Sequence, residues 1–336
     1  MQVGPLVFRV TAPRLSDLPA ASTTSRGWPF DVESPRLATG GDGPPLPRIS
    51  VVVATLNQGP YIERMLRSVL LQGYPDLELI IHDGGSTDGS LEVLRKYDPW
   101  ITYWTSEPDR GQSHAINKGL ARATGDLVCI FDTDDYFPVG SLGAVGAFHA
   151  ARPDCLIGGD VIQQWEDRED AYVHVRDSDL RDYVAWWRID HVAGPGVFYP
   201  RSIVQRAGLV DEELHYLWDY EFTLRCLAFA PLISLGVITA FMVHTRGSKG
   251  IGSANNSIWE LAEILKRQYP AFPDLRAESE RRLAGMLLGH GVMRLARGHE
   301  GGAASVAEAF RTAPLAAMAW AFPGWPWRRL RRLLRR

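Results

Sequence analysis

The sequence predicts an α/β fold: a doubly wound, mostly parallel sheet flanked by helices, followed by a helical C-terminal extension. Apolar β-branched runs alternate with helically periodic stretches over residues 49–131, and this alternation is typical of parallel sheets. Beyond residue 257 the apolar spacing is helical throughout. The 336 residues are 46% hydrophobic and 22% charged, as in globular proteins, and leave room for about two domains.

The first strand is expected at residues 49–54, where a β-branched run is typical of a strand buried on both faces. A helix beginning near Pro60 follows, with apolar residues on one stripe. The next elements are strands at 77–82, 101–104 and 127–131, with a helix after residue 90 and another over 112–123. This order predicts parallel strands, whose ligands lie beyond their carboxyl ends.

After residue 150 the alternation is looser, with strands expected at 155–160 and 171–175 and a helix over 218–229. Residues 226–245 carry no Lys, Arg, Asp or Glu and have the length of a membrane span. Pro231 and Gly236 interrupt this stretch, so we predict a buried strand after a helix instead.

Composition divides the chain into segments and excludes some classes of function. Residues 1–47 are rich in Pro, Gly, Ser and Thr and predict a flexible arm, followed by a main domain over 48–250, a helical extension over 251–311 and a basic tail over 312–336. The net charge of −3 gives no global case for nucleic-acid binding, and we expect no nucleic-acid partner. Three cysteines without a CxxC pair argue against a disulfide framework or zinc ribbon, and a reduced, cytoplasmic compartment fits best.

Polar side chains follow three of the first four expected strands. The segments are Thr55-Leu56-Asn57, the run from Asp83 to Gly89, and Asp132-Thr133-Asp134-Asp135. Each alone is compatible with an ordinary turn or helix cap. Because parallel strands bring their carboxyl ends to one edge, the three together indicate a ligand site.

The aspartates at 132, 134 and 135 give the strongest signal. Crowded carboxylates repel one another unless a cation or proton offsets the charge, and Mg²⁺ is commonly held with nucleotides by one or two carboxylates. One alternative is a solvated acidic turn. Another is the DxD opening of haloacid-dehalogenase-like phosphatases, but Tyr136 stands where that family has Thr, and the motif does not open the fold.

Residues 48–250 resemble the family-2 glycosyltransferases with a GT-A fold. The matching segments, in order, are Ser50 to Asn57, Gln72 to Pro75, Asp83 to Gly89, Glu107 to Gln112, Ala115 to Gly119, Asp132 to Asp135, Trp218 to Glu221 and His244 to Lys249. The resemblance implies a GT-A type sheet and an enzyme that inverts the anomeric centre.

The resemblance also implies roles for individual residues. A nucleotide-sugar donor would be held by Thr55, Asn57, Asp83, Asn117, Lys118, Asp132, Ser248 and Lys249. Asp134 and His244 would bind a divalent cation, Mg²⁺ or Mn²⁺, and Asp219 would be the general base. His82 and His114 depart from residues common in the family, which leaves the donor nucleotide open.

We therefore predict a metal-dependent, hexosyltransferase-type enzyme acting in cell-surface polysaccharide or lipid-linked glycan synthesis. Its acceptor would be a hydroxyl of a glycan or lipid-linked molecule. The alternative is a catalytically silent nucleotide-sugar or glycan-binding module on the same fold. Asp219 could be a helix cap, and Glu221 competes with it for the role of base.

The basic tail suggests a further partner. Trp327, Leu330 and Leu334 would share one face of a helix, with most of six arginines on the other. Tryptophan and leucine opposite arginine are typical of helices in an anionic membrane interface, so we expect attachment to the inner face of the membrane. A frayed tail or a helix packed on the domain are the alternatives.

Overall fold

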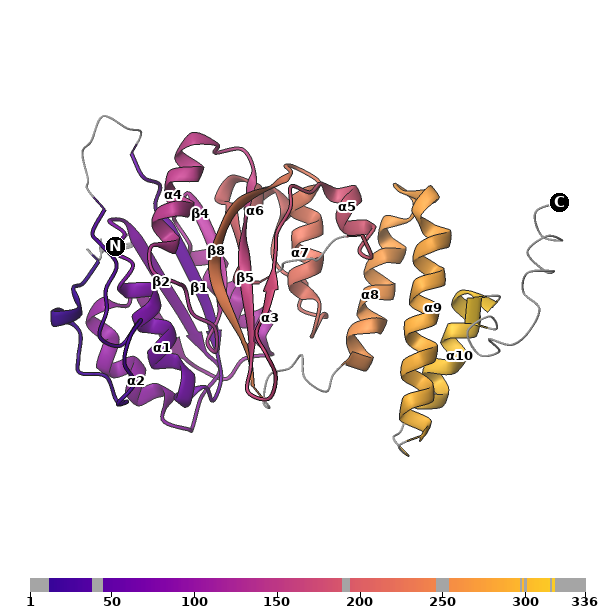
Figure 1. The fold of residues 1–336 in the computed structure, drawn as a ribbon, viewed down its shortest axis with the longest axis horizontal. Helices are drawn as coiled ribbons and strands as arrows, with labels where there is room; N and C mark the ends of the chain where they lie inside the picture. Colours follow the sequence, from indigo (N-terminus) through magenta and orange to yellow (C-terminus); the bar gives the residue numbers. More distant parts are fainter. Residues whose placement is uncertain are drawn as a thin grey trace, which may run out of the picture. The chain divides into compact units, whose positions relative to one another are not determined.

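The computed structural model describes residues 12–37, 45–188, 194–245, 254–296, 298, 301–314 and 316–317 (Figure 1). Two compact units divide the chain, Met1–Ser248 and Lys249–Arg336. Ser248, Lys249 and residues 318–336 of the predicted tail lie outside the described residues.

The first unit contains one mixed sheet in the order β3-β2-β1-β4-β7-β5-β6, with β8 paired to β5. The strands are β1 (Ile49–Thr55), β2 (Leu77–Asp83), β3 (Tyr103–Ser106), β4 (Leu127–Asp132), β5 (Leu156–Trp165), β6 (Ala171–Val173), β7 (Val197–Pro200) and β8 (Leu232–His244). Strands β3, β2, β1 and β4 are parallel, whereas β7 runs antiparallel to both β4 and β5. The predicted doubly wound, mostly parallel sheet is confirmed.

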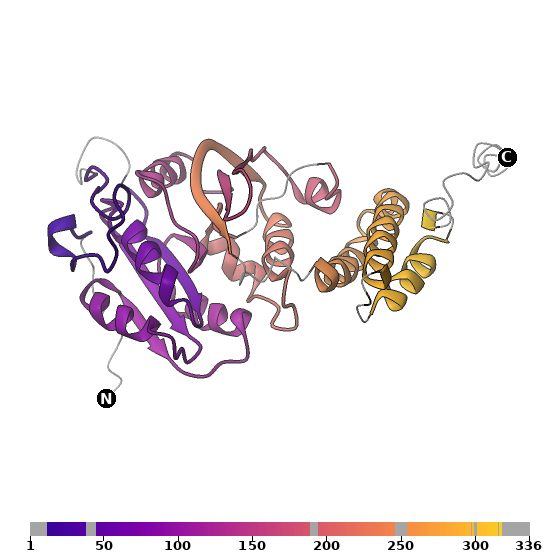
Figure 2. The same cartoon turned by 60° about the horizontal axis from the view of Figure 1, so that its bottom comes forward.

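Helices flank this sheet (Figure 2). They are α1 (Gly59–Leu70), α2 (Ser90–Tyr97), α3 (Gln112–Arg122), α4 (Ser141–Ala151), α5 (Leu180–Val184), α6 (Arg201–Ala207) and α7 (Trp218–Leu227). Pro60 lies in the first turn of α1, and the apolar stripe of that helix is fully buried at Ile62, Met65 and Leu66. Helix α3 packs on β1 and β2 so closely that a Cβ at Gly119 would lie 2.3 Å from Val52 Cγ1. The α3–sheet contact therefore requires glycine.

The uncharged stretch over 226–245 contains the end of α7 and the long, curved strand β8 (Figures 1 and 2). This agrees with the predicted strand after a helix. Within the described residues, no helix has both the length and the apolarity needed to cross a bilayer.

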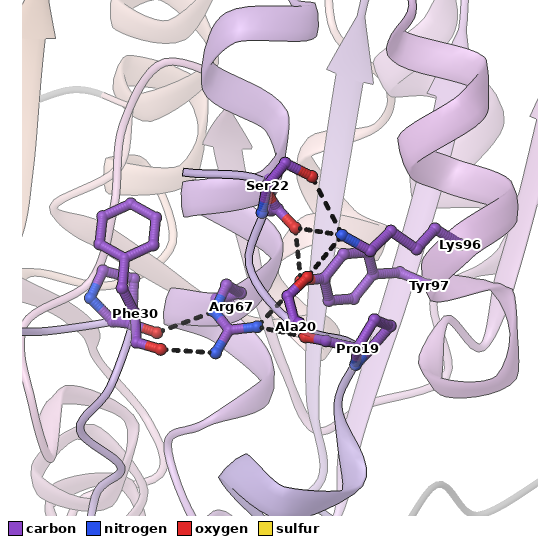
Figure 3. Close-up of polar contacts among 9 residues, drawn as sticks. Pro19, Ala20, Ser22, Phe30, Arg67, Lys96 and Tyr97 are labelled. Atoms are coloured by element: carbon purple, nitrogen blue, oxygen red, sulfur yellow. Dashed lines mark hydrogen bonds and ion pairs between the residues drawn. The ribbon is translucent and has the colours of Figure 1, made fainter. Parts of the chain in front are cut away.

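Residues 12–37 differ from the flexible arm that their composition predicted, because they are fixed to α1 by side-chain donors (Figure 3). The buried Arg67 guanidinium donates to the carbonyls of Pro19 (3.0 Å), Pro29 (3.0 Å) and Phe30 (2.8 Å), and to Tyr97 Oη (3.0 Å). The described part of this segment forms no strand, so the Arg67 side chain supplies hydrogen bonds that a neighbouring strand would otherwise donate to these carbonyls.

A second set of contacts fixes the same segment to α2. The Glu63 carboxylate accepts hydrogen bonds from Lys96 Nζ, Tyr97 Oη and the backbone N–H of Ser22, at 2.8–2.9 Å. Lys96 also donates to the Ala20 carbonyl at 2.7 Å (Figure 3). The donors lie 33 to 76 residues from their acceptors in the sequence, so the composition of residues 12–37 could not predict these hydrogen bonds.

The second unit is helical, as predicted. It contains α8 (Ala254–Gln268), α9 (Pro273–Ala296) and α10 (Gly302–Thr312). Helices α9 and α10 approach closely at Gly291, where a Cβ would lie 2.7 Å from the Gly302 carbonyl oxygen. Tyr269 and Ser279 add a buried hydroxyl–hydroxyl hydrogen bond of 3.0 Å between α8 and α9.

Candidate functional site

The sheet brings the predicted strand-end residues to one edge. In the parallel register Thr55 pairs with Asp83, and Ala54 pairs with Asp132. The Thr55 hydroxyl is buried and has no hydrogen-bond partner among the described residues. A polar atom of this kind, at the carboxyl end of a central strand, is available to a ligand.

The loops after β1 and β2 are joined to each other. Asn57 has a left-handed backbone (φ 53°), and its side-chain oxygen accepts from the N–H of Thr87 at 2.9 Å. Its own N–H donates to Ser86 Oγ at 2.7 Å. Asn57, predicted to touch the donor, thus shapes the edge of the site through its contacts with the neighbouring loop.

The Asp83 carboxylate is almost fully buried and accepts hydrogen bonds from neighbouring protein groups. It accepts from the N–H groups of Gly85 (3.0 Å) and Ser86 (2.8 Å) and from Ser106 Oγ (2.6 Å), and it makes a short contact with Ser86 Oγ. These bonds order the turn after β2. The carboxylate therefore has few remaining lone pairs for a nucleobase.

A second carboxylate, Asp109, reaches this place from the loop after β3. A Cβ at Gly84 would lie 2.8 Å from Asp109 Oδ2, so the carboxylate approaches the Gly84 backbone closely. The exposed Leu56 side chain adjoins the same point, 3.4 Å from that Cβ position. Asp109 was not among the predicted site residues, although it lies in the segment Glu107 to Gln112 that resembles the family.

Two residues of α3 that are predicted to bind the donor make contacts with protein groups. Asn117 exchanges hydrogen bonds with the backbone N–H (2.8 Å) and C=O (3.0 Å) of Val210 and donates to Glu212 at 3.1 Å. Lys118 pairs with Glu107 at 2.7 Å. The hydrogen bond from Asn117, with that from Arg110, lowers the pKa of Glu212. These contacts order the loops around the site.

The turn after β4 carries the three aspartates in different surroundings. Gln112 at the start of α3 donates to Asp132 Oδ1 at 2.8 Å. Asp135 is buried and accepts the backbone N–H of Val243 at 2.8 Å. Burial raises the pKa of Asp135 well above its usual range, and the charges of Asp132 and Asp134 raise it further. Asp135 is therefore an internal anchor of the acidic cluster, which agrees with its having been given no ligand role.

His244 ends β8 close to these aspartates. Its ring stacks on Trp165 with centroids 4.8 Å apart and an interplanar angle of 15°. Burial lowers the pKa of His244, while the negative charge of Asp134 acts in the opposite direction. Its Nε2 atom is buried without a hydrogen-bond partner among the described residues, so a neutral ring has a lone pair available to a cation or ligand.

These residues could supply only part of the coordination shell of a divalent cation. Over the described part of the chain, no group of three or more His, Cys, Asp or Glu side chains could by itself hold a metal ion. Cations bound with nucleotides need only one or two protein ligands, because phosphate and water oxygens supply the rest. Asp134 and the His244 nitrogen are suitable donors for such a shell.

The two candidate bases lie in the first turn of α7. Asp219 accepts the N–H of Tyr220 at 2.7 Å, and its other carboxylate oxygen lies 3.8 Å from the position that a Cβ would take at Gly194. Glu221 is buried and is bound through both oxygens by Arg225, at 2.8–3.0 Å. The pair at 221 and 225 has the character of a structural ion pair.

Comparison with known proteins finds that the similar proteins are glycosyltransferases. The model of the family described as Glycosyl transferase family 2 matches residues 50–208. An uncharacterized glycosyltransferase of Mycobacterium tuberculosis (strain CDC 1551 / Oshkosh) is 30% identical over 233 residues, which cover 67% of this chain and 86% of that protein. A PGL/p-HBAD biosynthesis glycosyltransferase of Mycobacterium bovis (strain BCG / Pasteur 1173P2) is 29% identical, over 66% and 84% of the two chains.

Solved structures show the same fold. S. aureus TarS 1-349 in complex with UDP-GlcNAc superposes with a TM-score of 0.60 at 19% identity, covering 81% of this chain and 83% of that one. The mannosyltransferase PcManGT from Pyrobaculum calidifontis, in complex with GDP-Man and Mn²⁺, gives 0.51 at 20% identity, covering 85% and 90%.

Proposed function

Because this chain belongs to glycosyl transferase family 2, and is therefore a glycosyltransferase of GT-A type, we propose that it is an inverting, metal-dependent enzyme. It would transfer a sugar from a nucleotide-diphosphate sugar to a hydroxyl acceptor. The observation that carries the proposal is the sheet edge at which the paired strands β1 and β4 end in Thr55 and Asp132. Asp134 follows in the next turn, and its charge acts on His244 at the end of β8.

The donor's diphosphate would lie at the end of β4. Asp134, with His244 Nε2, would hold Mg²⁺ or Mn²⁺ there, and Asp132 would bind the donor beside it. The cation would supply Lewis-acid stabilisation of the leaving diphosphate. Gln112 orients Asp132 through its 2.8 Å hydrogen bond. The solved neighbours that bind UDP-GlcNAc, and GDP-Man with Mn²⁺, support a nucleotide-sugar donor and a divalent cation.

The acceptor hydroxyl must lose its proton as the new bond forms, and a positioned carboxylate can accept it. Asp219 is the better candidate, because the Glu221 carboxylate is already bound by Arg225 through both oxygens. A single base opposite the leaving group permits direct displacement. Such a displacement inverts the anomeric carbon.

The acceptor would be a glycan or lipid-linked molecule in cell-surface polysaccharide or lipid-linked glycan synthesis. A relative is named for PGL/p-HBAD biosynthesis, which makes acceptors of that class suitable for testing. The basic tail over 312–336 would hold the enzyme on an anionic membrane at the cytoplasmic face, beside such an acceptor.

The test is a panel of nucleotide sugars with Mn²⁺, Mg²⁺ or EDTA. We expect one donor to raise the melting temperature and to release its nucleoside diphosphate only with a divalent cation. Binding without hydrolysis or transfer, across an acceptor panel that includes lipid-linked and PGL/p-HBAD-type molecules, would favour the silent binding module. Transfer that persists in EDTA would contradict metal dependence.

A further inference from the structure

The turn that carries Asp132 and Asp134 is fastened to the strand that carries His244. Tyr136 N–H donates to the Phe241 carbonyl (3.2 Å), and Phe241 N–H donates back to Tyr136 (2.9 Å). One residue earlier, the Asp135 carboxylate accepts the N–H of Val243 at 2.8 Å. Since His244 follows Val243 directly, these bonds fix the histidine relative to the aspartates.

Arg64 of α1 braces the same turn from the other side. Its Nη2 donates to the backbone carbonyl of Asp134 at 2.8 Å. Its guanidinium lies over the Tyr136 ring, with Cζ 4.6 Å from the centroid. The Tyr136 ring in turn stacks on Phe241, with centroids 4.6 Å apart and planes 12° from parallel. Arg64, Tyr136 and Phe241 thus form one stack that joins α1, the turn and β8.

This brace opposes a local repulsion. Two carboxylates, Asp132 and Asp134, lie two residues apart beside the buried Asp135, so the turn needs contacts that hold it in place. Loss of the arginine would remove both a positive charge and the donor to the Asp134 carbonyl. The turn would then relax away from β8, and Asp134 would no longer face His244.

We propose that Arg64 and Asp135 are positioning residues that hold the Asp132–Asp135 turn against β8 and so set the cation-dependent affinity for the donor's diphosphate. Neither residue touches the donor. The inference rests on the proposed function, because it assumes that the diphosphate and its cation bind at this turn.

The experiment is calorimetric titration of the full chain with the nucleoside diphosphate that the wild type binds best, in Mn²⁺ and in EDTA. We expect Arg64→Ala to weaken binding in Mn²⁺ by about 10- to 100-fold, as for other residues that orient metal ligands. Affinity in EDTA, and affinity for the nucleoside monophosphate, should stay unchanged. The matched control is Arg95→Ala, which removes an exposed arginine from α2 and should bind like the wild type.

Asp135 gives an independent route should Arg64→Ala fail to fold. Asp135→Asn can still accept the Val243 N–H and should bind the diphosphate normally, whereas Asp135→Ala should share the Mn²⁺-dependent defect. Unchanged affinity in Arg64→Ala, or an equal loss in Mn²⁺ and EDTA, would overturn the positioning role. A wild type that binds no nucleoside diphosphate at all would instead refute the proposed function.

Discussion

Arg225 binds the Glu221 carboxylate through both oxygens, with Nε 2.8 Å from Oε1 and Nη2 2.8 Å from Oε2. The same guanidinium donates to the carbonyls of Ala207 and Leu209, so one arginine joins α7 to the end of α6 and the loop that follows it. Both oxygens of the Glu221 carboxylate are therefore already occupied by protein donors, in charge-assisted bonds. This contact favours Asp219, the predicted base, over its competitor Glu221.

Asp219→Asn should lower turnover by at least about 10²-fold while leaving donor affinity unchanged, because it removes a base and keeps the side-chain shape. Steady-state kinetics and donor titration on the same preparation measure both quantities. If turnover survives, another group takes the proton and Asp219 has only a structural role in the first turn of α7.

Glu221→Gln is the matched comparison. It should keep most of the turnover but lower the free energy of unfolding by about 1–3 kcal/mol, since it weakens a charge-assisted pair that is largely buried. Urea denaturation gives the stability. A large loss of turnover in a stably folded Glu221→Gln protein would move the base to position 221.

Asp134→Ala should abolish the Mn²⁺ dependence of nucleoside diphosphate binding without unfolding the protein. The turn would remain attached to β8 through Asp135 and Tyr136, neither of which is changed. Calorimetry in Mn²⁺ and EDTA, with circular dichroism as the folding control, tests this. Equal Mn²⁺ affinity in the variant and the wild type would contradict the metal assignment.

Arg67→Met should destabilise the protein by at least about 3 kcal/mol. The substitution keeps an apolar stem but leaves buried carbonyls of Pro19, Pro29 and Phe30 without their donor. Limited proteolysis should then cut within residues 12–37 faster than in the Arg95→Ala control. A stable variant with a protected N-terminal segment would show that apolar packing alone holds this segment.

Stability should fall as the pH drops below about 6.5, the ordinary pKa of histidine. Burial lowers the pKa of His82, and the charges of Lys118 and Arg122 lower it further. The unfolded chain therefore binds more protons than the folded one in this range, and protonation favours unfolding. His82→Phe should flatten the dependence of the unfolding free energy on pH between 7 and 5; an unchanged slope would assign it to other groups.

Deletion of residues 318–336 should abolish binding to anionic liposomes while leaving α10 (Gly302–Thr312) intact. The six arginines removed would each contribute roughly 1 kcal/mol at an anionic surface, and nothing comparable at a neutral one. Co-sedimentation with vesicles of each charge measures the effect. Equal binding of the full chain to anionic and neutral vesicles would exclude an electrostatic anchor.

Local sequence patterns predicted the alternating strands and helices over residues 49–131 and the sheet edge at which the polar strand ends gather, but not α4, α5, α6 or β7. Both follow from local signals: β-branched runs such as 49–54 are strands, and parallel strands place the residues after them on the same side of the sheet. The match of short motifs also identified the family. None of this required knowledge of which residues meet across the fold.

The three-dimensional fold decides which polar groups are hydrogen-bonded to other parts of the protein. Asp135 meets Val243 across 108 residues, Asn117 meets Val210 across 93, and Arg67 meets Pro29 across 38. A residue type and its neighbours in sequence do not specify such partners, because the closure of the chain brings them within hydrogen-bond distance. For this reason Asp135, predicted as part of an acidic cluster, is a buried anchor, and residues 12–37, predicted to be flexible, pack against α1.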